Sequence, residues 1–189
     1  MAYETPNYRI MEELGEVELR EYEAYLVAQV AVDGDLEGAG NRGFKVLAGY
    51  IFGGNRGSSR ISMTGAVTQE SAPKETKIQM TSPVTQQRGE GDFVIQFMMP
   101  SEFTLDTLPV PDDDRIELRE VPARQLAAIR YSGRWSKRSY QANLERMCDV
   151  LHEASLTPTG EPVWARYDPP FKPWFMRRNE VLTEFEPVA

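Results

Sequence analysis

Residues 17–34 read VELREYEAYLVAQVAVDG, and residues 116–133 read IELREVPARQLAAIRYSG. The second segment starts 99 residues after the first, at position 116 instead of 17, and the two align without a gap. Seven of the eighteen positions are identical, and three more exchange one aliphatic residue for another. A match of this length within one chain indicates an internal duplication. The identical pairs are Glu18/Glu117, Leu19/Leu118, Arg20/Arg119, Glu21/Glu120, Ala24/Ala123, Ala28/Ala127 and Gly34/Gly133.

Each copy alternates apolar and polar residues, which is the pattern of a half-buried strand pair. After each copy the spacing of the apolar residues changes to that of an amphipathic helix. This spacing predicts helices over 36–52 and 136–154. The glycines at 53 and 54 end the first one. The core stripes expected on these helices are Phe44, Leu47, Ala48 and Ile51 on the first, and Tyr140, Leu144, Met147, Cys148 and Leu151 on the second.

Further strands are predicted after each helix, and residues 157–160 are expected to form only a connection. Together these elements predict an α+β fold of two β-β-α-β-β units. The units join into one distorted open barrel or curved sheet flanked by two helices. The chain 1–189 is then a single domain of two pseudo-repeats, about 7–107 and 112–187, with a linker over 108–115. The predicted strands are 61–69, 78–86 and 93–100 in the first half, and 162–168 and 179–186 in the second.

The composition is that of an ordinary globular protein of 189 residues, with a net charge of −8. That charge argues against general nucleic-acid binding. The single Cys excludes an internal disulfide. We find no apolar run long enough to span a membrane and no secretory signal, so a cytoplasmic location without a membrane partner is expected. A monomer is the expected state.

No set of residues predicts catalysis or a metal site. The one histidine, His152, falls on the polar stripe of the second helix, where a solvated side chain is expected. Cys148 falls on the apolar stripe and is expected to be a buried thiol. The acidic run 112–114 lacks the glycine and the terminal glutamate of a calcium loop.

Two segments carry features of a binding site. The first helix has a second face, formed by Arg42, Lys45, Val46 and Gly49, on which a planar group could lie close to the backbone. An ordinary charged outer face gives the same spacing, so both interpretations stay open. The second segment, 165–181, reads ARYDPPFKPWFMRRNEV. Its prolines exclude a helix or a central strand and predict a stiff loop that presents aromatic residues and cations.

Five motifs are spread along almost the whole chain: AGNRGFKVLAGYIFGGN (39–55), KIQMTSPV (77–84), FMMP (97–100), RYSG (130–133) and YDPPFKPWFMRRNEV (167–181). In these motifs the chain resembles the SOUL haem-binding protein family, also called the SOUL/p22 haem-binding proteins. The resemblance runs from about residue 7 to residue 186, and the last motif is the most specific.

The resemblance implies a fold similar to the effector-binding domains of multidrug-responsive regulators. It also implies non-covalent binding of haem or another porphyrin, in a buffering or carrier role, without catalysis. The ligand would lie in a shallow apolar cleft beside the first helix, with its propionates paired to basic groups. By motif match these groups are Arg42 and Lys172. The remaining ligand-binding positions are Lys45, Val46, Gly49 and Phe171.

The sequence departs from the family pattern in two ways. Lys45 and Gly49 replace apolar residues on the exposed helix face, which weakens contact with a porphyrin ring. The histidine proposed as an iron ligand in some members has no equivalent, because His152 lies in the second helix. The resemblance therefore predicts little selectivity for haem over metal-free porphyrin.

Three other functions stay open on the sequence. One is a sensor-like module that binds other flat or amphipathic molecules. Another is a hydrolase of small substrates, which requires a carboxylate with a raised pKa, such as Glu120 or Asp168, in the cleft. The third is a role in protein interactions.

Overall fold

The computed structural model describes residues 4–57, 76–89, 93–168 and 171–188. The predicted strand 61–69 lies outside these residues. The described elements, in chain order, are β1 (Tyr8–Leu14), β2 (Val17–Tyr22), β3 (Tyr25–Val32), α1 (Leu36–Ile51), β4 (Asn55–Arg56), β5 (Val84–Arg88), β6 (Phe93–Met98), β7 (Val110–Pro111), β8 (Glu117–Val121), β9 (Arg124–Tyr131), α2 (Lys137–Glu153), β10 (Leu156–Arg166), the 3-10 helix η1 (Trp174–Met176) and β11 (Asn179–Pro187).

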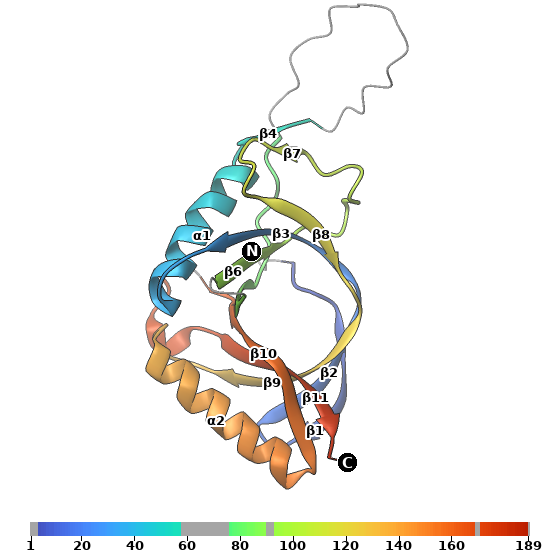
Figure 1. The fold of residues 1–189 in the computed structure, drawn as a ribbon, viewed down its shortest axis with the longest axis vertical. Coiled ribbons are helices and arrows are strands. Elements are labelled where there is room, and N and C mark those ends of the chain that lie inside the picture. The colour runs from blue at the N-terminus through green and yellow to red at the C-terminus, as the bar shows by residue number, and fades with distance from the viewer. Residues whose placement is uncertain (1–3, 58–75, 90–92, 169–170, 189) are drawn as a thin grey trace, which may run out of the picture.

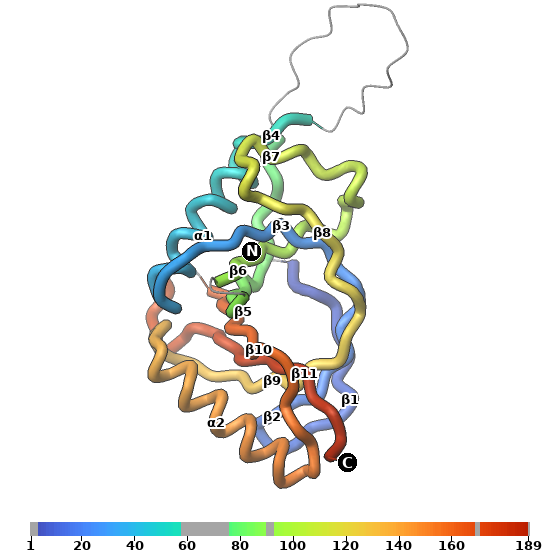
Figure 2. Tube along the Cα trace, viewed as in Figure 1, coloured from blue at the N-terminus to red at the C-terminus, as the bar shows by residue number. Residues whose placement is uncertain are grey.

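One antiparallel sheet dominates the fold, with the strand order β1-β2-β9-β11-β10-β5-β6-β3-β8, and β4 and β7 pair separately. The sheet curls strongly but stays open between its edge strands β1 and β8. Both helices lie on the outside of the curve, and the chain path is clearest in the trace (Figures 1 and 2). α1 packs on β3 and β6, and α2 packs on β9, β10 and β11. The α+β fold with a curved open sheet and two flanking helices is therefore as predicted.

The strands within each copy of the repeat do not pair with each other, which corrects the expected strand pairs. β2 pairs with β9 of the other copy, and β3 pairs with β8. The two pairings have matching registers. Arg20 lies opposite Leu126 in one pairing, and their counterparts in the repeat, Arg119 and Val27, lie opposite each other in the second. The first strand of each copy thus pairs with the second strand of the other copy. A duplication accounts for this agreement in register, and that origin stays a prediction.

The short connections explain why the strands of one copy do not fold back on each other. A two-residue hairpin requires positive φ angles at its turn. Residues 23–24 and 122–123, which join β2 to β3 and β8 to β9, have none. The N–H of Glu23 instead donates to the carbonyl of Asn7 (3.1 Å). By contrast, Gly15 at φ 64° turns the β1–β2 hairpin, whose first strand the sequence analysis did not predict.

The strand expected over 78–86 is shorter in the structure, because β5 begins only at Val84. Pro83 has no N–H to donate to a ladder. The two N–H groups at the ends of the preceding stretch bond outside the sheet. That of Ile78 donates to the Ile51 carbonyl, and that of Ser82 donates to the Glu4 carbonyl, each at 2.9 Å. The stretch is thus held without forming a strand.

The expected connection over 157–160 is instead the start of β10, which begins at Leu156. Its pairing with β11 shifts register between Thr159 and Val163. Gly160 lies in this interval at φ 66°. The glycine therefore marks a bulge within a strand, where β10 has two residues more than β11, and not the end of a loop.

α2 begins and ends within one residue of the predicted bounds. Met147 and Leu151 of its expected stripe are buried against the sheet. Tyr140, Leu144 and Cys148 are only half-buried along the margin of that contact.

α1 is also predicted well in extent, and the side chain of Asp35 caps it by accepting from the N–H of Gly38 (2.6 Å). Its core stripe is only partly right. Leu47 and Ile51 are buried, but Phe44 is 37% exposed and Ala48 is half-buried. The helix is turned so that glycines lie directly against the sheet, and Phe44 lies at the margin of this contact, with its ring centre 5.3 Å from that of Phe97 on β6.

Gly43 decides this orientation, because a Cβ at that position would lie 2.3 Å from Cγ1 of Ile95 on β6. Only a glycine allows the two backbones to approach this closely. Gly49, on the exposed side of α1, would place a Cβ with nothing within 4 Å.

The two glycines therefore respond differently to the same substitution. We expect Gly43→Ala to lower the free energy of unfolding by about 1–3 kcal/mol, because the added methyl overpacks the contact with Ile95. Gly49→Ala is the matched control and should raise it by up to about 1 kcal/mol, since alanine favours a helix over glycine. Urea unfolding followed by circular dichroism measures both. Equal effects of the two substitutions would contradict the proposed contact.

Candidate functional site

Four of the predicted ligand-binding residues form one continuous strip along the outside of α1. Arg42, Lys45, Val46 and Gly49 follow one another at spacings of three and four residues, which places them on one side of a helix. Arg42, Lys45 and Gly49 are exposed, and Val46 is half-buried beside them. The open space at Gly49 leaves a flat area on this strip.

Arg42 is turned toward the start of its helix. Its guanidinium donates to the backbone carbonyl of Asp33 and lies 4.0 Å from the carboxylate of the same residue. Both side chains are half or more exposed. A pair this exposed is weak, so Arg42 is available to an anionic group at the edge of the strip.

The other two predicted residues lie on the loop before β11. Phe171 is 86% exposed, the largest value among the exposed large apolar side chains. Lys172 is half-buried, and its Nζ lies 2.7 Å from Oδ1 of Asp168. Three more large apolar side chains on the same loop are 50–60% exposed: Trp174, Phe175 and Met176.

The loop is bonded to the segment that follows β9. The N–H of Gly133 donates to the carbonyl of Trp174 (3.2 Å). The Asn179 side chain accepts from Nε1 of Trp135 (2.7 Å) and donates to the carbonyl of Gly133 (3.3 Å). Two sequence motifs recognised separately, RYSG and the proline-rich loop, thus form one structural unit.

The cations around this unit stack on aromatic rings. The guanidinium of Arg166 lies 4.3 Å from the ring centre of Trp164 and 5.1 Å from that of Trp135. Arg177 lies over the same Trp135 ring at 4.7 Å. Burial lowers the pKa of Arg166 to about 10. These contacts explain in part why aromatic residues and cations are concentrated here, since they pack against each other.

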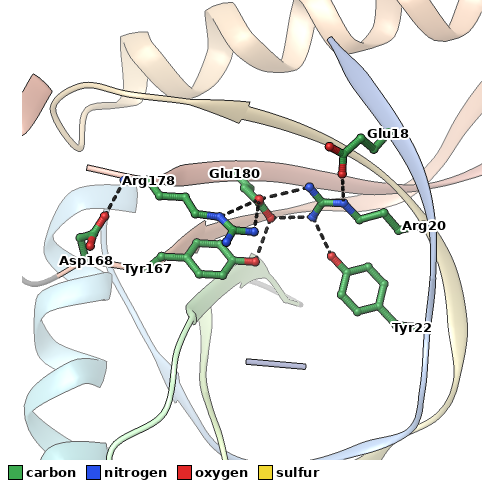
Figure 3. Close-up of polar contacts among 7 residues, drawn as sticks. All are labelled: Glu18, Arg20, Tyr22, Tyr167, Asp168, Arg178 and Glu180. Atoms are coloured by element: carbon green, nitrogen blue, oxygen red, sulfur yellow. Dashed lines mark hydrogen bonds and ion pairs between the residues drawn. The ribbon is translucent and has the colours of Figure 1, made fainter. Parts of the chain in front are cut away.

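A buried ionic network joins the loop to the interior of the sheet (Figure 3). Glu180, at the start of β11, is fully buried and accepts from Nη1 of Arg20 (2.8 Å), from Nη2 of Arg178 (2.7 Å) and from the hydroxyl of Tyr167 (2.8 Å). Arg20 also pairs with Glu18 (2.7 Å). Every partner of the Glu180 carboxylate is a donor, so the network holds it ionised.

The same network positions Lys172. The backbone N–H of Arg178 donates to Oδ2 of Asp168 (2.6 Å), while Oδ1 of Asp168 accepts from Lys172. Lys172 is therefore connected through Asp168 and Arg178 to Glu180. The close-up shows Asp168 and Arg178 on the side of the network nearest α1.

The pKa values follow from these contacts. Burial alone would raise the pKa of Glu180, but the hydrogen bond and charge of Arg20, together with Arg178, outweigh it and lower that pKa. The pKa of Asp168 is lowered for the same kind of reason. Burial alone would raise it, but the N–H of Arg178 and the charge of Lys172 outweigh that effect. Arg20 has a raised pKa, because Glu180 and Tyr22 outweigh its burial.

The structure does not assemble a catalytic group from the remaining candidates. His152 is exposed in the last turn of α2. Cys148 is half-buried, and burial raises the pKa of its thiol, which keeps it protonated. Glu120 is exposed on β8. In the described part of the chain, no three His, Cys, Asp or Glu side chains are grouped so as to hold a metal ion, and no helix has the length and apolar character needed to cross a membrane.

Sequence reasoning missed the ionic network entirely. Arg20 belongs to the repeat, but its copy Arg119 is exposed, so the repeat itself gives no sign that one of the two is buried. A usable signal is the strand alternation in β11, which places Glu180 and Leu182 on the same face. A carboxylate on an inward face predicts a buried cationic partner.

Comparison with known protein families decides the kinship of the chain. A family model described as "SOUL heme-binding protein" matches residues 3–184. The chain belongs to the SOUL haem-binding protein family. A search of curated proteins found no match.

Solved structures with a similar fold are distant from this SOUL protein in sequence. A protein described as a hydrolase from Listeria innocua has 12% identity and a TM-score of 0.61, with 90% of this chain and 92% of that chain covered. EcmrR in a complex with DNA has 11% identity and a TM-score of 0.59, with 91% of this chain and 57% of that chain covered. The C-terminal domain of EcmrR has 11% identity and a TM-score of 0.51, covering 96% and 99%. Likeness at this level establishes the fold alone.

The ionic network should be essential for stability. We expect Glu180→Gln to lower the free energy of unfolding by about 3–5 kcal/mol, because Arg20 would stay buried without its main counter-charge. The control is Glu186→Gln, an exposed position on the same strand, with an expected change within about 0.5 kcal/mol. Urea unfolding measures both, and a loss below about 1 kcal/mol for Glu180→Gln would contradict the assigned role.

The lowered pKa values of Glu180 and Asp168 predict a dependence on acid. A carboxylate whose folded pKa lies below its unfolded value stabilises fully above the unfolded pKa, about 4 for these residues, and loses that contribution as the pH falls through the folded pKa. The melting temperature should therefore decline below about pH 4.5. Melting curves from pH 7 to pH 3 test this. The decline should be shallower in Glu180→Gln, and identical slopes would exclude Glu180 as a cause.

Proposed function

We propose that this protein binds haem or a related tetrapyrrole non-covalently, in a buffering or carrier role, on the outer strip of α1 next to the loop before β11. Membership of the SOUL family supports this class of ligand. The observation that carries the location is the strip itself, where a flat open area at Gly49 lies beside the side chains of Arg42 and Lys45.

The residues present suit a porphyrin that is held by its ring and its carboxylates. Val46 and Phe171 offer apolar contact, and the space at Gly49 admits a planar group close to the helix backbone. Arg42 has only a weak exposed partner. Lys172 is paired with Asp168, so a propionate would compete with that carboxylate for it.

The strip offers two cations and no histidine, so its recognition would rest on the ring and the propionates. The bound haem iron would then have no protein ligand on this strip. We propose accordingly that metal-free protoporphyrin binds about as well as haem, that the protein acts as a monomer in the cytoplasm, and that its ligand is a small planar molecule rather than a nucleic acid.

The alternative from a different class is a sensor-like module for other flat or amphipathic molecules. The fold likeness to the EcmrR C-terminal domain favours it. Drugs or dyes that compete with porphyrin and bind more tightly would support this alternative.

Hydrolysis has less support, although two structural neighbours from Listeria innocua are described as hydrolases. A carboxyl group that acts as a general acid near neutral pH needs a raised pKa. Asp168 has a lowered pKa, and so does the buried Glu180. We therefore propose a binding protein without catalytic activity.

A charge-reversal experiment tests the proposed site. The purified protein is titrated with hemin and with protoporphyrin, followed by the Soret band, next to the double variant Arg42→Glu/Lys172→Glu. We expect saturable one-to-one binding of both porphyrins, weakened at least tenfold in the double variant, because each substitution removes a partner of a propionate.

A matched control is Arg119→Glu/Lys77→Glu, which reverses two exposed charges outside the proposed site and should leave the affinity unchanged. Weak binding that does not saturate, or equal affinity in both double variants, would remove the proposed site and direct attention to other ligands.

A further inference from the structure

The loop before β11 carries an exposed apolar surface that the proposed porphyrin site does not use. Four of the ten exposed large apolar side chains in the described chain lie within positions 171–176 of this loop. Phe171 belongs to the proposed porphyrin site, which leaves Trp174, Phe175 and Met176, each 50–60% exposed. Single exposed apolar residues are common, but a group of them on one loop marks an interaction surface.

The backbone beneath these side chains is hydrogen-bonded within the loop. In η1 the N–H of Met176 donates to the carbonyl of Pro173 (2.9 Å), and that of Arg177 donates to the carbonyl of Trp174 (3.3 Å). A backbone N–H that leaves water needs such a partner. The loop can therefore present its side chains to an apolar phase while these two N–H groups stay bonded.

Cations surround the exposed aromatic side chains. The segments 133–138 and 171–178, which the Gly133–Trp174 hydrogen bond joins, contain six Lys and Arg residues and no Asp or Glu. The whole chain, by contrast, has a net charge of −8. Arg134 and Arg138 of the first segment are exposed. The guanidinium of Arg134 lies 5.9 Å from the ring centre of Trp174.

Few carboxylates offset these cations. Asp168 and the buried Glu180 are paired with cations of the second segment. The exposed Glu37, in the first turn of α1, accepts from the first backbone N–H of α2 (3.0 Å). Arg134 and Arg138 form no ion pair among the described residues. The surface thus keeps a local positive charge.

This combination fits the surface of an anionic phospholipid bilayer. Trp and Phe side chains favour the boundary between headgroups and acyl chains, and anionic headgroups attract Lys and Arg. A second copy of this protein does not fit, because a symmetric dimer would bring two cationic surfaces together. The surface lies at the outer margin of the molecule, next to the first turns of α1 and α2 (Figure 1), so a flat partner can reach it.

The acidic residues elsewhere in the chain do not prevent this contact. At physiological ionic strength, exposed charges are screened over about 8 Å. A bilayer that touches the loop therefore interacts mainly with the cations next to it. The attraction requires one orientation of the protein, with the loop toward the bilayer.

We propose that this loop docks the protein reversibly onto anionic phospholipid membranes. Trp174, Phe175 and Met176 enter the boundary between headgroups and acyl chains, while Arg134 and Arg138 contact lipid phosphates. The contact needs no membrane-spanning segment, and it revises the expectation that the protein has no membrane partner. It uses none of the six residues of the proposed porphyrin site, so either proposal can fail without the other.

Co-sedimentation with vesicles made of equal parts of phosphatidylcholine and phosphatidylglycerol tests the apolar contact. We expect saturable binding that Trp174→Ala/Phe175→Ala weakens by about tenfold or more, because the side chains that enter the bilayer are removed. The matched control is Phe52→Ala/Val110→Ala, which removes two equally exposed apolar side chains near the other end of α1. It should bind like the wild-type protein, and equal losses in the two double variants would contradict the proposal.

The cations are tested with the same vesicles. Arg134→Gln/Arg138→Gln should weaken binding by about tenfold or more, because each cation is attracted to the anionic surface. The control Arg119→Gln/Lys77→Gln removes two exposed cations outside the surface and should leave binding unchanged. Vesicles of phosphatidylcholine alone should bind the wild-type protein far more weakly. Equally tight binding to both kinds of vesicle would contradict the role of the cations.

Tryptophan fluorescence reports the insertion directly. Of the three tryptophans, Trp174 is the exposed one. Anionic vesicles should therefore shift the wild-type emission to shorter wavelength, and bromine atoms on the upper acyl chains should quench it. Trp174→Phe should still bind and should lose the shift. A shift that persists in Trp174→Phe would overturn the proposal. Absence of wild-type binding to anionic vesicles would also overturn it, and would direct the search to an acidic protein partner.

Discussion

The buried pair of Arg20 and Glu180 is the constraint on which the rest of the structure depends. It joins β2 to β11, 160 residues apart in sequence, and removes both charges from water. Such a pair is stable only when the remaining donors and acceptors of both groups are satisfied. The hydroxyls of Tyr22 and Tyr167 and the guanidinium of Arg178 meet that requirement. Two strands, β2 and β11, and the loop between β10 and β11 are thereby fixed relative to each other.

The loop before β11 takes its order from this pair. Its exposed aromatic residues would otherwise be expected to collapse onto nearby apolar surface. Instead, Arg178 and Asp168 bond its two ends together, and the Trp135–Asn179 hydrogen bond holds its base against the start of α2. For the binding role that we propose, a loop whose two ends are already held in place would lose less entropy when a ligand arrives. The same few side chains thus stabilise the interior of the sheet and hold the ends of the loop at the surface.

The sequence predicts the local features of this fold better than its long-range pairing. Helix bounds follow from the spacing of residues such as Leu47 and Ile51, because that spacing is set by helix geometry alone. The same spacing places Arg42 and Gly49 on one exposed strip. The pairing of β2 and β8 with strands of the other copy could not be predicted. It depends on the absence of tight hairpin turns between β2 and β3 and between β8 and β9. The role of Glu180 could not be predicted either, because its partner Arg20 lies on a distant strand and no local sequence pattern identifies it.

The exchange of strands also has a consequence for the history of such a chain. One copy alone would lack the outer strand of its sheet, because that strand comes from the other copy. An exposed sheet edge pairs readily with another chain. Two separate copies could complete each other only as an interlocked dimer in which each lends a strand, an arrangement known as domain swapping. The covalent link between the halves replaces a bimolecular assembly by an intramolecular one, with the same hydrogen bonds.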